Sequence, residues 1–315
     1  METGFHHPKN AIKASMPPKQ SPFFWLSPFI FLAMGAFAAC DPGGDTVISA
    51  ALLESFAIIA VNLFVLASGY LGYGSAHRFS RVIELWLQTL FWSFFLGILC
   101  SLLNLIPREQ ISFKQLLFPI LNGQNWYICT YFGLLPFMPV LDKAVGSMTN
   151  RQSFEFVLFG AALLSVLNFT APVDSFGVER GYSLAWFIFL YLVGAILRSR
   201  ETAACAPGTI NSFVLVGLYA FSQIATFLIL ASEASLNPSS ALSSRTLYYN
   251  APTVFISAVA FFILLIRFKT KSSIASSSFA AINTVILDVY LIHEHPLVRN
   301  TFISGRFAVL ALHGT

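Results

Sequence analysis

The segment at residues 254–268, "VFISAVAFFILLIRF", decides the fold class of this chain. A barrel strand with one face in lipid alternates apolar and polar residues over about ten positions. This segment is instead apolar on every side, with Arg267 as its only charged residue. Helices of that kind are buried in a protein or lie in a membrane. We therefore expect a membrane helix here rather than a strand.

The rest of the chain has the same character. Of its 315 residues, 56% are hydrophobic and 15% are aromatic, and the mean hydropathy is +0.72. A soluble domain of this size cannot hide that much apolar surface, so much of it must face lipid. A helix needs roughly 20 mostly apolar residues to span the hydrocarbon layer. About ten such runs occur, near residues 23–40, 51–73, 82–106, 126–145, 154–172, 182–198, 210–232, 249–268, 279–293 and 301–312.

The predicted fold class is therefore all-α: a polytopic transmembrane helical bundle of about ten spans. Residues 1–22 form a polar, basic leader, and residues 23–315 form one membrane domain whose last helix is short. With the amino terminus inside, the inner segments carry 12 of the 18 basic residues and the outer segments carry six. Basic residues accumulate in cytoplasmic loops of membrane proteins, so we expect both termini in the cytoplasm. The same asymmetry explains the net charge of +4 without a nucleic-acid partner.

Polar residues inside apolar segments are candidates for function, because they are costly in a membrane. Ser68 and Gly69 lie near the inner end of the second segment, and such small residues let helix backbones approach closely. Asn62 lies in the middle of the same segment. An amide there either bonds across helices or lines a substrate path. The loop that follows presents His77, Arg78 and Arg81. These residues either set the topology or form a cradle for a polyanionic donor, since arginine matches the geometry of phosphate oxygens.

Aromatic residues begin two further segments. Asn125 and Trp126 open the fourth segment, and Tyr182 and Trp186 open the sixth. The spacing of Tyr182 and Trp186 predicts that they share one helical face. Such residues either anchor helices at the membrane interface or form an outer mouth able to stack on a sugar.

Charge is densest at residues 288–300, "DVYLIHEHPLVRN". His293 and His295 flank Glu294, and Pro296 prevents normal helix continuation at its own nitrogen. A metal site is not expected, because H-x-H on a helix points the two rings about 200° apart. The alternatives are a general acid/base role for this group, or a helix end emerging into water.

Read in order, six segments resemble the acyltransferase 3 family of bacterial integral-membrane acyltransferases, most closely its exopolysaccharide O-acetylation branch. They are "AVNLFVLASGYLGYG", "RVIELWLQTLFWS", "NWYICTYFGLLPFMPVLDKAV", "GYSLAWFIFLYLVGAILR", "YYNAPTVFISAVAFF" and "VYLIHEHPLVR". The resemblance implies a ten-helix bundle in the bacterial inner membrane. It also implies transfer of an acyl group, acetyl by expectation, from cytoplasmic acyl-CoA to a hydroxyl of a cell-surface or exported carbohydrate. Family members carry an arginine and a histidine in their first helix, whereas "FFWLSPFIFLAMGAFAACDPGGD", residues 23–45, has neither.

These observations predict three groups of site residues. Arg78 and Arg81 hold the donor phosphates. His293, Glu294 and His295 form the catalytic group on the acceptor side. The acceptor route is expected to be lined by Asn62, Asn125, Trp126, Tyr182, Trp186 and Arg299. The expected partners are the lipid bilayer, the carbohydrate acceptor and proteins of glycan synthesis or export. The alternative function is a polysaccharide export component or a catalytically inactive family member.

Overall fold

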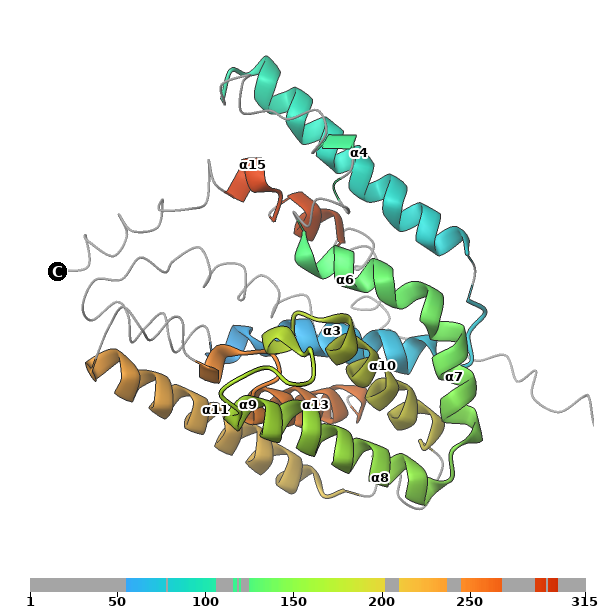
Figure 1. Ribbon diagram of the computed structural model, residues 1–315, viewed down its shortest axis with the longest axis vertical. Helices are drawn as coiled ribbons and strands as arrows, with labels where there is room; N and C mark the ends of the chain where they lie inside the picture. Colours follow the sequence, from blue (N-terminus) through green and yellow to red (C-terminus); the bar gives the residue numbers. More distant parts are fainter. Residues whose placement is uncertain are drawn as a thin grey trace, which may run out of the picture.

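The computed structural model describes residues 55–77, 79–105, 116–117, 119, 125–201, 210–236, 245–267, 287–292 and 294–299. Every regular element in these ranges is a helix (Figure 1). The expectation of an all-α fold is therefore confirmed for the part of the chain that is described. Predictions about the leader, the first apolar segment and the last apolar segment fall outside these ranges.

The elements appear in the following order along the chain. They are α3 (Ile59–Gly72), α4 (Ser80–Leu102), α6 (Trp126–Leu134), η2 (Leu135–Phe137), α7 (Met138–Ser147), α8 (Asn150–Gly160), the π-helical η3 (Ala161–Leu167), α9 (Asn168–Thr170), η4 (Glu179–Gly181), α10 (Leu184–Ser199), α11 (Ser212–Leu236), η6 (Arg245–Leu247), α13 (Pro252–Arg267) and α15 (Pro296–Val298).

Six helices in the described ranges are long and apolar enough to cross a membrane. They are Ser55–Gly72, Ser80–Leu102, Trp126–Ser147, Asn150–Thr170, Ser212–Glu233 and Arg245–Arg267. Leu184–Ser199 is apolar but shorter. These seven helices coincide with seven of the ten predicted segments. The total of ten spans and the cytoplasmic position of the termini remain predictions.

The centre of the bundle is α10, which packs against α3, α6, α7 and α8, while α3 also contacts α13. Small residues allow the closest approach. A Cβ added at Gly69 would lie 2.0 Å from the Tyr191 carbonyl oxygen, and one at Gly194 would lie 2.1 Å from the Leu66 carbonyl oxygen. The backbones of α3 and α10 are therefore nearly in contact, as the Ser68-Gly69 pair predicts.

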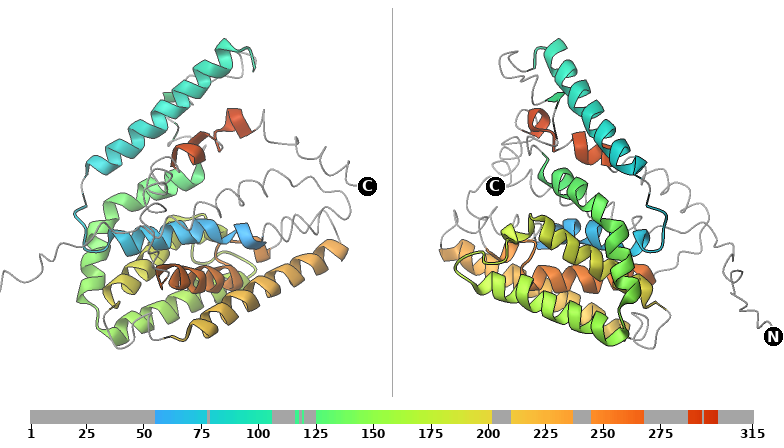
Figure 2. Two further views of the ribbon diagram at one scale, coloured as in Figure 1. Left: turned by 180° about the vertical axis from the view of Figure 1, so that it is seen from behind. Right: turned by 45° about the vertical axis from the view of Figure 1, so that its right-hand side comes forward.

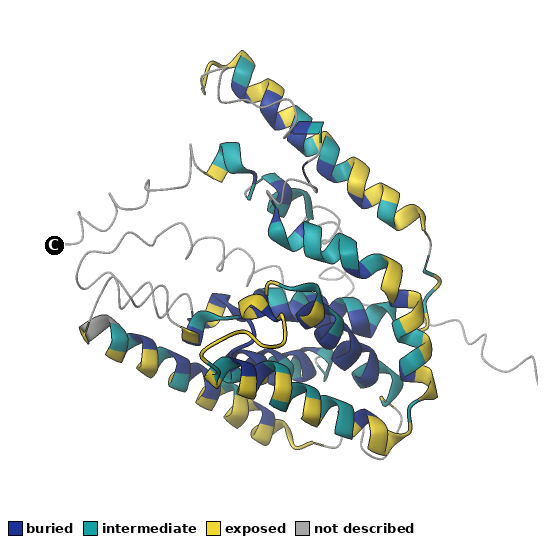
Figure 3. Cartoon of the chain, viewed as in Figure 1, coloured by how far each residue is buried: buried dark blue, intermediate teal, exposed yellow. Residues whose placement is uncertain are grey.

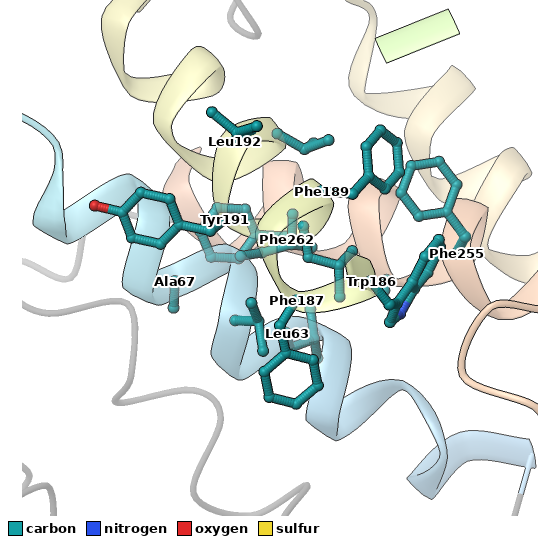
Figure 4. Packing of buried hydrophobic residues seen from close by; sticks show 14 of the residues in the cluster. Leu63, Ala67, Trp186, Phe187, Phe189, Tyr191, Leu192, Phe255 and Phe262 are labelled. Atoms are coloured by element: carbon teal, nitrogen blue, oxygen red, sulfur yellow. The ribbon is translucent and has the colours of Figure 1, made fainter. Parts of the chain in front are cut away.

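Large side chains fill the space on either side of this crossing (Figure 4). The labelled residues come from α3, α10 and α13: Leu63, Ala67, Trp186, Phe187, Phe189, Tyr191, Leu192, Phe255 and Phe262. By contrast, the outer faces of α8 and α11 expose apolar side chains such as Phe154 and Phe213 (Figure 3). Exposed apolar faces on both of these candidate spans are what contact with lipid requires.

α4 stands apart from the α3, α10 and α13 group, with α6 and the carboxyl-terminal α15 between them (Figures 1 and 2). The contacts of α4 with α6 and α15 fix this arrangement. Asp288 strengthens it, since its Oδ1 accepts hydrogen bonds from Gln88 Nε2 at 2.5 Å and Trp92 Nε1 at 2.6 Å. This carboxylate therefore ties the carboxyl-terminal segment to the middle of α4.

Polar side chains mark the two ends of the bundle. We call one the His77 end, where α3, α7, α10 and α13 finish and α4, α8 and α11 begin. Hydrogen bonds from Arg200 to Ser153 and from Arg267 to Ser212 join the helices there. We call the other the Trp126 end, where α6, α10 and α13 begin.

Candidate functional site

A cluster of polar groups at the His77 end is centred on Asp142 of α7. Asp142 Oδ2 accepts from His77 Nε2 at 2.8 Å, and Oδ1 accepts from Tyr191 Oη at 2.8 Å. The Gly74 N–H donates to Oδ2 at 3.2 Å. Only 13% of the His77 side chain and 12% of the Asp142 side chain are exposed. The carboxylate is therefore held by three donors, two from the loop after α3 and one from α10.

The loop after α3 makes this arrangement possible. Gly74 has φ of 72°, a left-handed conformation that glycine adopts at no steric cost. The chain turns there and brings His77 back over the end of α3. A Cβ at Gly72 would lie 3.0 Å from Tyr191 Oη and 3.6 Å from His77 Cε1. Glycine at position 72 thus leaves room for the phenol and the imidazole to meet the same carboxylate.

Arg81, one of the two predicted donor ligands, lies beside this cluster. Its charge interacts with the Tyr131 and Tyr191 phenols, and its own side chain is exposed. Tyr131 Oη in turn donates to Ser68 Oγ at 3.2 Å. Arg78, the other predicted ligand, lies outside the described residues.

The sequence placed His77 in the loop with Arg78 and Arg81 but gave it no role in the site of its own, and Asp142 was not a predicted site residue. A signal was present, because Asp142 is an ionisable group inside the apolar segment at residues 126–145. Such a group in a membrane segment needs a partner or a purpose. Its partner, His77, is 65 positions away in the sequence.

The Trp126 end carries an aromatic cluster. Trp126 has its ring centroid 4.3 Å from that of Tyr182 and 5.3 Å from that of Tyr249, with which it stacks. Tyr182 is 37% exposed, so the cluster reaches the surface. Asn125 is buried beside it, and its Oδ1 has no hydrogen-bond partner among the described residues. Three residues predicted to line the acceptor route therefore lie together.

Two of the other three predicted lining residues, Asn62 and Trp186, lie deeper. Asn62 Oδ1 accepts from Trp186 Nε1 at 3.1 Å, and Asn62 Nδ2 donates to the Tyr249 carbonyl oxygen at 2.8 Å. Both Asn62 and Trp186 are fully buried. The prediction that Tyr182 and Trp186 share a helical face was wrong. Ser183 caps α10 by accepting from the Trp186 N–H, so the helix begins at Leu184 and Tyr182 lies outside it.

The carboxyl-terminal stretch reaches the same end of the bundle. The Tyr290 ring lies 5.5 Å from that of Tyr127 on α6. The Tyr290 phenol also interacts electrostatically with Tyr182, Glu294 and Arg299. Glu294 and Arg299 form an ion pair of 3.3 Å, with 20% and 44% of their side chains exposed. The predicted residues Glu294 and Arg299 are thus brought near the aromatic cluster.

His293 lies outside the described residues, but His295 does not. Its Nδ1 accepts from the Leu297 N–H at 3.3 Å and so caps α15, which starts at Pro296. His295 is only 3% exposed, and its Nε2 has no partner in the described part of the chain. Burial lowers the pKa of the His295 imidazole to about 4, which keeps it neutral at neutral pH.

A loop between α9 and α10 borders the aromatic cluster and is held by Asp174. Burial alone would raise the pKa of the Asp174 carboxyl, but hydrogen bonds from the Glu179 and Val178 N–H groups and from Asn168 outweigh it and lower the pKa. Glu179 and Arg180 have φ of 48° and 61°, which is uncommon outside glycine. The carboxylate thus stabilises a strained turn directly before Tyr182.

Comparison with known proteins supports an assignment at the level of the family. A family model described as an acyltransferase domain matches residues 15–308. No curated protein and no solved structure matches significantly.

Proposed function

We propose a function from the premise that the chain belongs to this acyltransferase family, as its ordered sequence segments predict. It is a membrane acyltransferase. In our proposal it takes an acyl group, acetyl by preference, from acyl-CoA and transfers it to a hydroxyl of a cell-surface or exported carbohydrate. The membrane would be the bacterial inner membrane.

The observation that carries the proposal is the separation of two chemically different clusters at the two ends of one bundle. The His77 end combines Arg81 with a partly buried carboxylate and imidazole. Arginine suits the phosphates of coenzyme A, because its planar group donates two parallel hydrogen bonds. We assign donor binding to this end, with Arg78 as a second ligand.

The Trp126 end suits a carbohydrate. Aromatic faces stack on the apolar faces of sugars, and Trp126 and Tyr182 form such a surface beside the Glu294–Arg299 ion pair. We assign acceptor binding to this end, with Asn125 as a polar contact. Asn62 and Trp186 would support this surface from within the core, because Asn62 is hydrogen-bonded both to Trp186 and to the Tyr249 carbonyl oxygen. His293, Glu294 and His295 would position the acceptor.

Transfer of radiolabelled acetyl from acetyl-CoA to carbohydrate tests the proposal. The purified full chain in liposomes is given acetyl-CoA and a bacterial exopolysaccharide whose esters have been removed by mild alkali. We expect label in the polysaccharide, and a loss of apparent donor affinity in Arg81→Gln. The matched control is Arg151→Gln, an exposed arginine at the same end whose ion pair with Glu155 lies on the surface. Equal donor affinity in the two variants would refute the donor assignment.

A second function has one observation in its favour. Residues 23–45 contain neither arginine nor histidine, although the family carries both in its first helix. An export component or an inactive family member needs neither. If the wild-type chain transfers no label to any acceptor but still binds the polysaccharide, this second function is supported and the first is refuted.

A further inference from the structure

Arg180 lies in the strained turn directly before Tyr182. Its side chain is exposed, and its guanidinium carbon lies 5.0 Å from the centroid of the Tyr248 ring. Within the described residues, the side chain forms no ion pair and no hydrogen bond. A guanidinium over an aromatic face is held there by a cation–π interaction, which leaves the N–H groups at its edge available to a ligand. The turn therefore presents an oriented cation to the surface.

The two carboxylates nearest to Arg180 in the sequence do not pair with it. Asp174 is already bonded to three backbone N–H groups of its own loop and to Asn168. The Glu179 side chain is exposed and forms no ion pair with a described residue. A ligand with its own carboxylate can therefore bind Arg180 without displacing an ion pair of the described chain.

The backbone at this position is unfavourable for arginine. Arg180 has φ of 61° and ψ of 17°, in the left-handed region that glycine adopts at no steric cost. Other residues lose stability in this conformation, and glycine already stands nearby at positions 177 and 181. Backbone strain of this kind gathers at active sites and ligand clamps. An arginine in such a position indicates a use for its side chain.

Arg180 also adjoins the aromatic cluster. Its carbonyl oxygen accepts from the Tyr249 N–H at 3.0 Å. The Tyr249 ring stacks on Trp126, with 5.3 Å between the ring centroids. Tyr182, two residues after Arg180, has its ring centroid 4.3 Å from that of Trp126. A sugar ring stacked on this cluster would therefore have the Arg180 guanidinium beside it.

We propose that Arg180 binds a carboxylate on the acceptor, so that the acceptor is an acidic carbohydrate, such as one with uronic acid residues. This inference rests on the proposed function and names the class of its acceptor. The planar guanidinium would donate two parallel hydrogen bonds to the carboxylate, while the aromatic cluster stacks on the sugar. Two other arginines at this end already have partners. Arg299 is paired with Glu294, and Arg245 donates to two backbone carbonyl oxygens.

Two forms of one polysaccharide test this selectivity. A de-esterified bacterial polysaccharide with glucuronate in its repeat is compared with the same polysaccharide after carbodiimide activation and borohydride reduction, which convert glucuronate to glucose. Transfer from radiolabelled acetyl-CoA is measured with the full chain in maltoside micelles. We expect KM for the acidic form to be about tenfold lower than KM for the neutral form. Added salt should raise KM for the acidic form alone, because it screens exposed charges.

Substitutions at Arg180 separate recognition from folding. Arg180→Gln should raise KM for the acidic form about tenfold and make the two forms equivalent. Arg180→Lys keeps the charge but not the planar fork, so it should retain only part of the preference. Arg180→Gly adopts the left-handed backbone without strain, so it should unfold at a temperature at least as high as Arg180→Gln and still lack the preference. The matched control is Arg245→Gln, which removes the same charge from a neighbouring turn and should keep the preference.

The outcomes separate this inference from the proposed function. Transfer to both forms with equal KM overturns the role of Arg180 and leaves the proposed function intact, and so does an acidic preference that Arg180→Gln retains. Equal KM together with a stabilisation by phosphatidylglycerol that Arg180→Gln loses would assign Arg180 to a lipid headgroup instead. If neither form is acetylated, the proposed transfer is refuted, and the affinities of the immobilised wild-type and Arg180→Gln chains for the two forms still decide whether Arg180 binds a carboxylate.

Discussion

Replacing Asn62 by leucine tests whether this amide supports the core or serves the substrate. The side chain is fully buried. Its Nδ2 donates to the Tyr249 carbonyl oxygen at 2.8 Å, and its Oδ1 accepts from Trp186 Nε1 at 3.1 Å. Leucine has a similar volume but can make neither bond, so the Trp186 indole and the Tyr249 carbonyl oxygen both lose the hydrogen bond that Asn62 provides.

The two broken bonds set the size of the effect. An unsatisfied buried polar group costs about 1–3 kcal/mol in soluble proteins. Hydrogen bonds between membrane helices are worth less, about 0.6 kcal/mol on average and at most about 1.7 kcal/mol. The amide lies between α3, α10 and the start of α13 rather than facing lipid. For its two bonds we therefore expect Asn62→Leu to lower the free energy of unfolding by about 2 kcal/mol.

Denaturant unfolding in mixed micelles measures this loss. Trp186→Phe removes the indole donor, and the double variant completes a thermodynamic cycle. Because the two side chains are bonded to each other, their losses should not add, and we expect a coupling free energy of about 1 kcal/mol. The acyl transfer rate is then measured at equal folded fractions, where Asn62→Leu should resemble wild type. A variant that is as stable as wild type but has lost transfer would refute this reasoning and assign the amide to the substrate.

Three further predictions follow from the packing and the charges. Gly194→Ala should destabilise the protein by about 2 kcal/mol or more, because its Cβ would lie 2.1 Å from the Leu66 carbonyl oxygen. Gly217→Ala, with nothing within 4 Å, should be neutral or stabilising in the same thermal unfolding assay. The free energy of unfolding should fall as the pH is lowered from about 6.5 to about 4, because the unfolded His295 binds a proton in that window and the buried one does not. The fall is on the order of 3 kcal/mol, and His295→Asn, which keeps a capping side chain without a titrating ring, should lack this contribution. Trp126→Ala should raise KM for the carbohydrate acceptor while leaving hydrolysis of acetyl-CoA by water unchanged, which a comparison of the two reactions will detect.

Much of the fold could be predicted because it depends on local composition. Runs such as residues 254–268 can be recognised as membrane helices from their own length and composition, without knowing which helices they pack against. The Ser68-Gly69 pair likewise predicted close helix packing, and Gly69 does lie against the Tyr191 carbonyl oxygen. The start of α10 was misjudged because Ser183 acts as a helix cap. A cap three residues before the buried Trp186 leaves Tyr182 outside the helix.

The site was only half predictable, for a different reason. The aromatic cluster was recognised because Trp126 and Tyr182 each begin an apolar segment. Aromatic residues at the ends of such segments mark a membrane interface even when their neighbours in space are unknown. His77 and Asp142 are informative only as a pair, and the two residues are 65 positions apart. A loop histidine beside arginines is ordinary in sequence. It gains a chemical role only when a carboxylate from another helix reaches it.

The direction in which Asp142 points also depends on a break inside what reads as one apolar segment. Pro136 cannot donate a backbone hydrogen bond, and residues Leu135–Phe137 form a 3-10 turn between α6 and α7. Such a turn advances about 120° per residue, compared with about 100° in an α-helix, so three residues rotate the following helix by about 60°. Periodicity counted from Tyr131 through the break therefore gives the wrong face for Asp142. If this rotation places the carboxylate against His77, then replacing both Pro136 and Pro139 by alanine, which permits a continuous α-helix, should weaken the His77–Asp142 bond. We expect a fall in the rate of acyl transfer without a fall in thermal stability, whereas an unchanged rate would show that the packing of α7 alone sets the direction of Asp142.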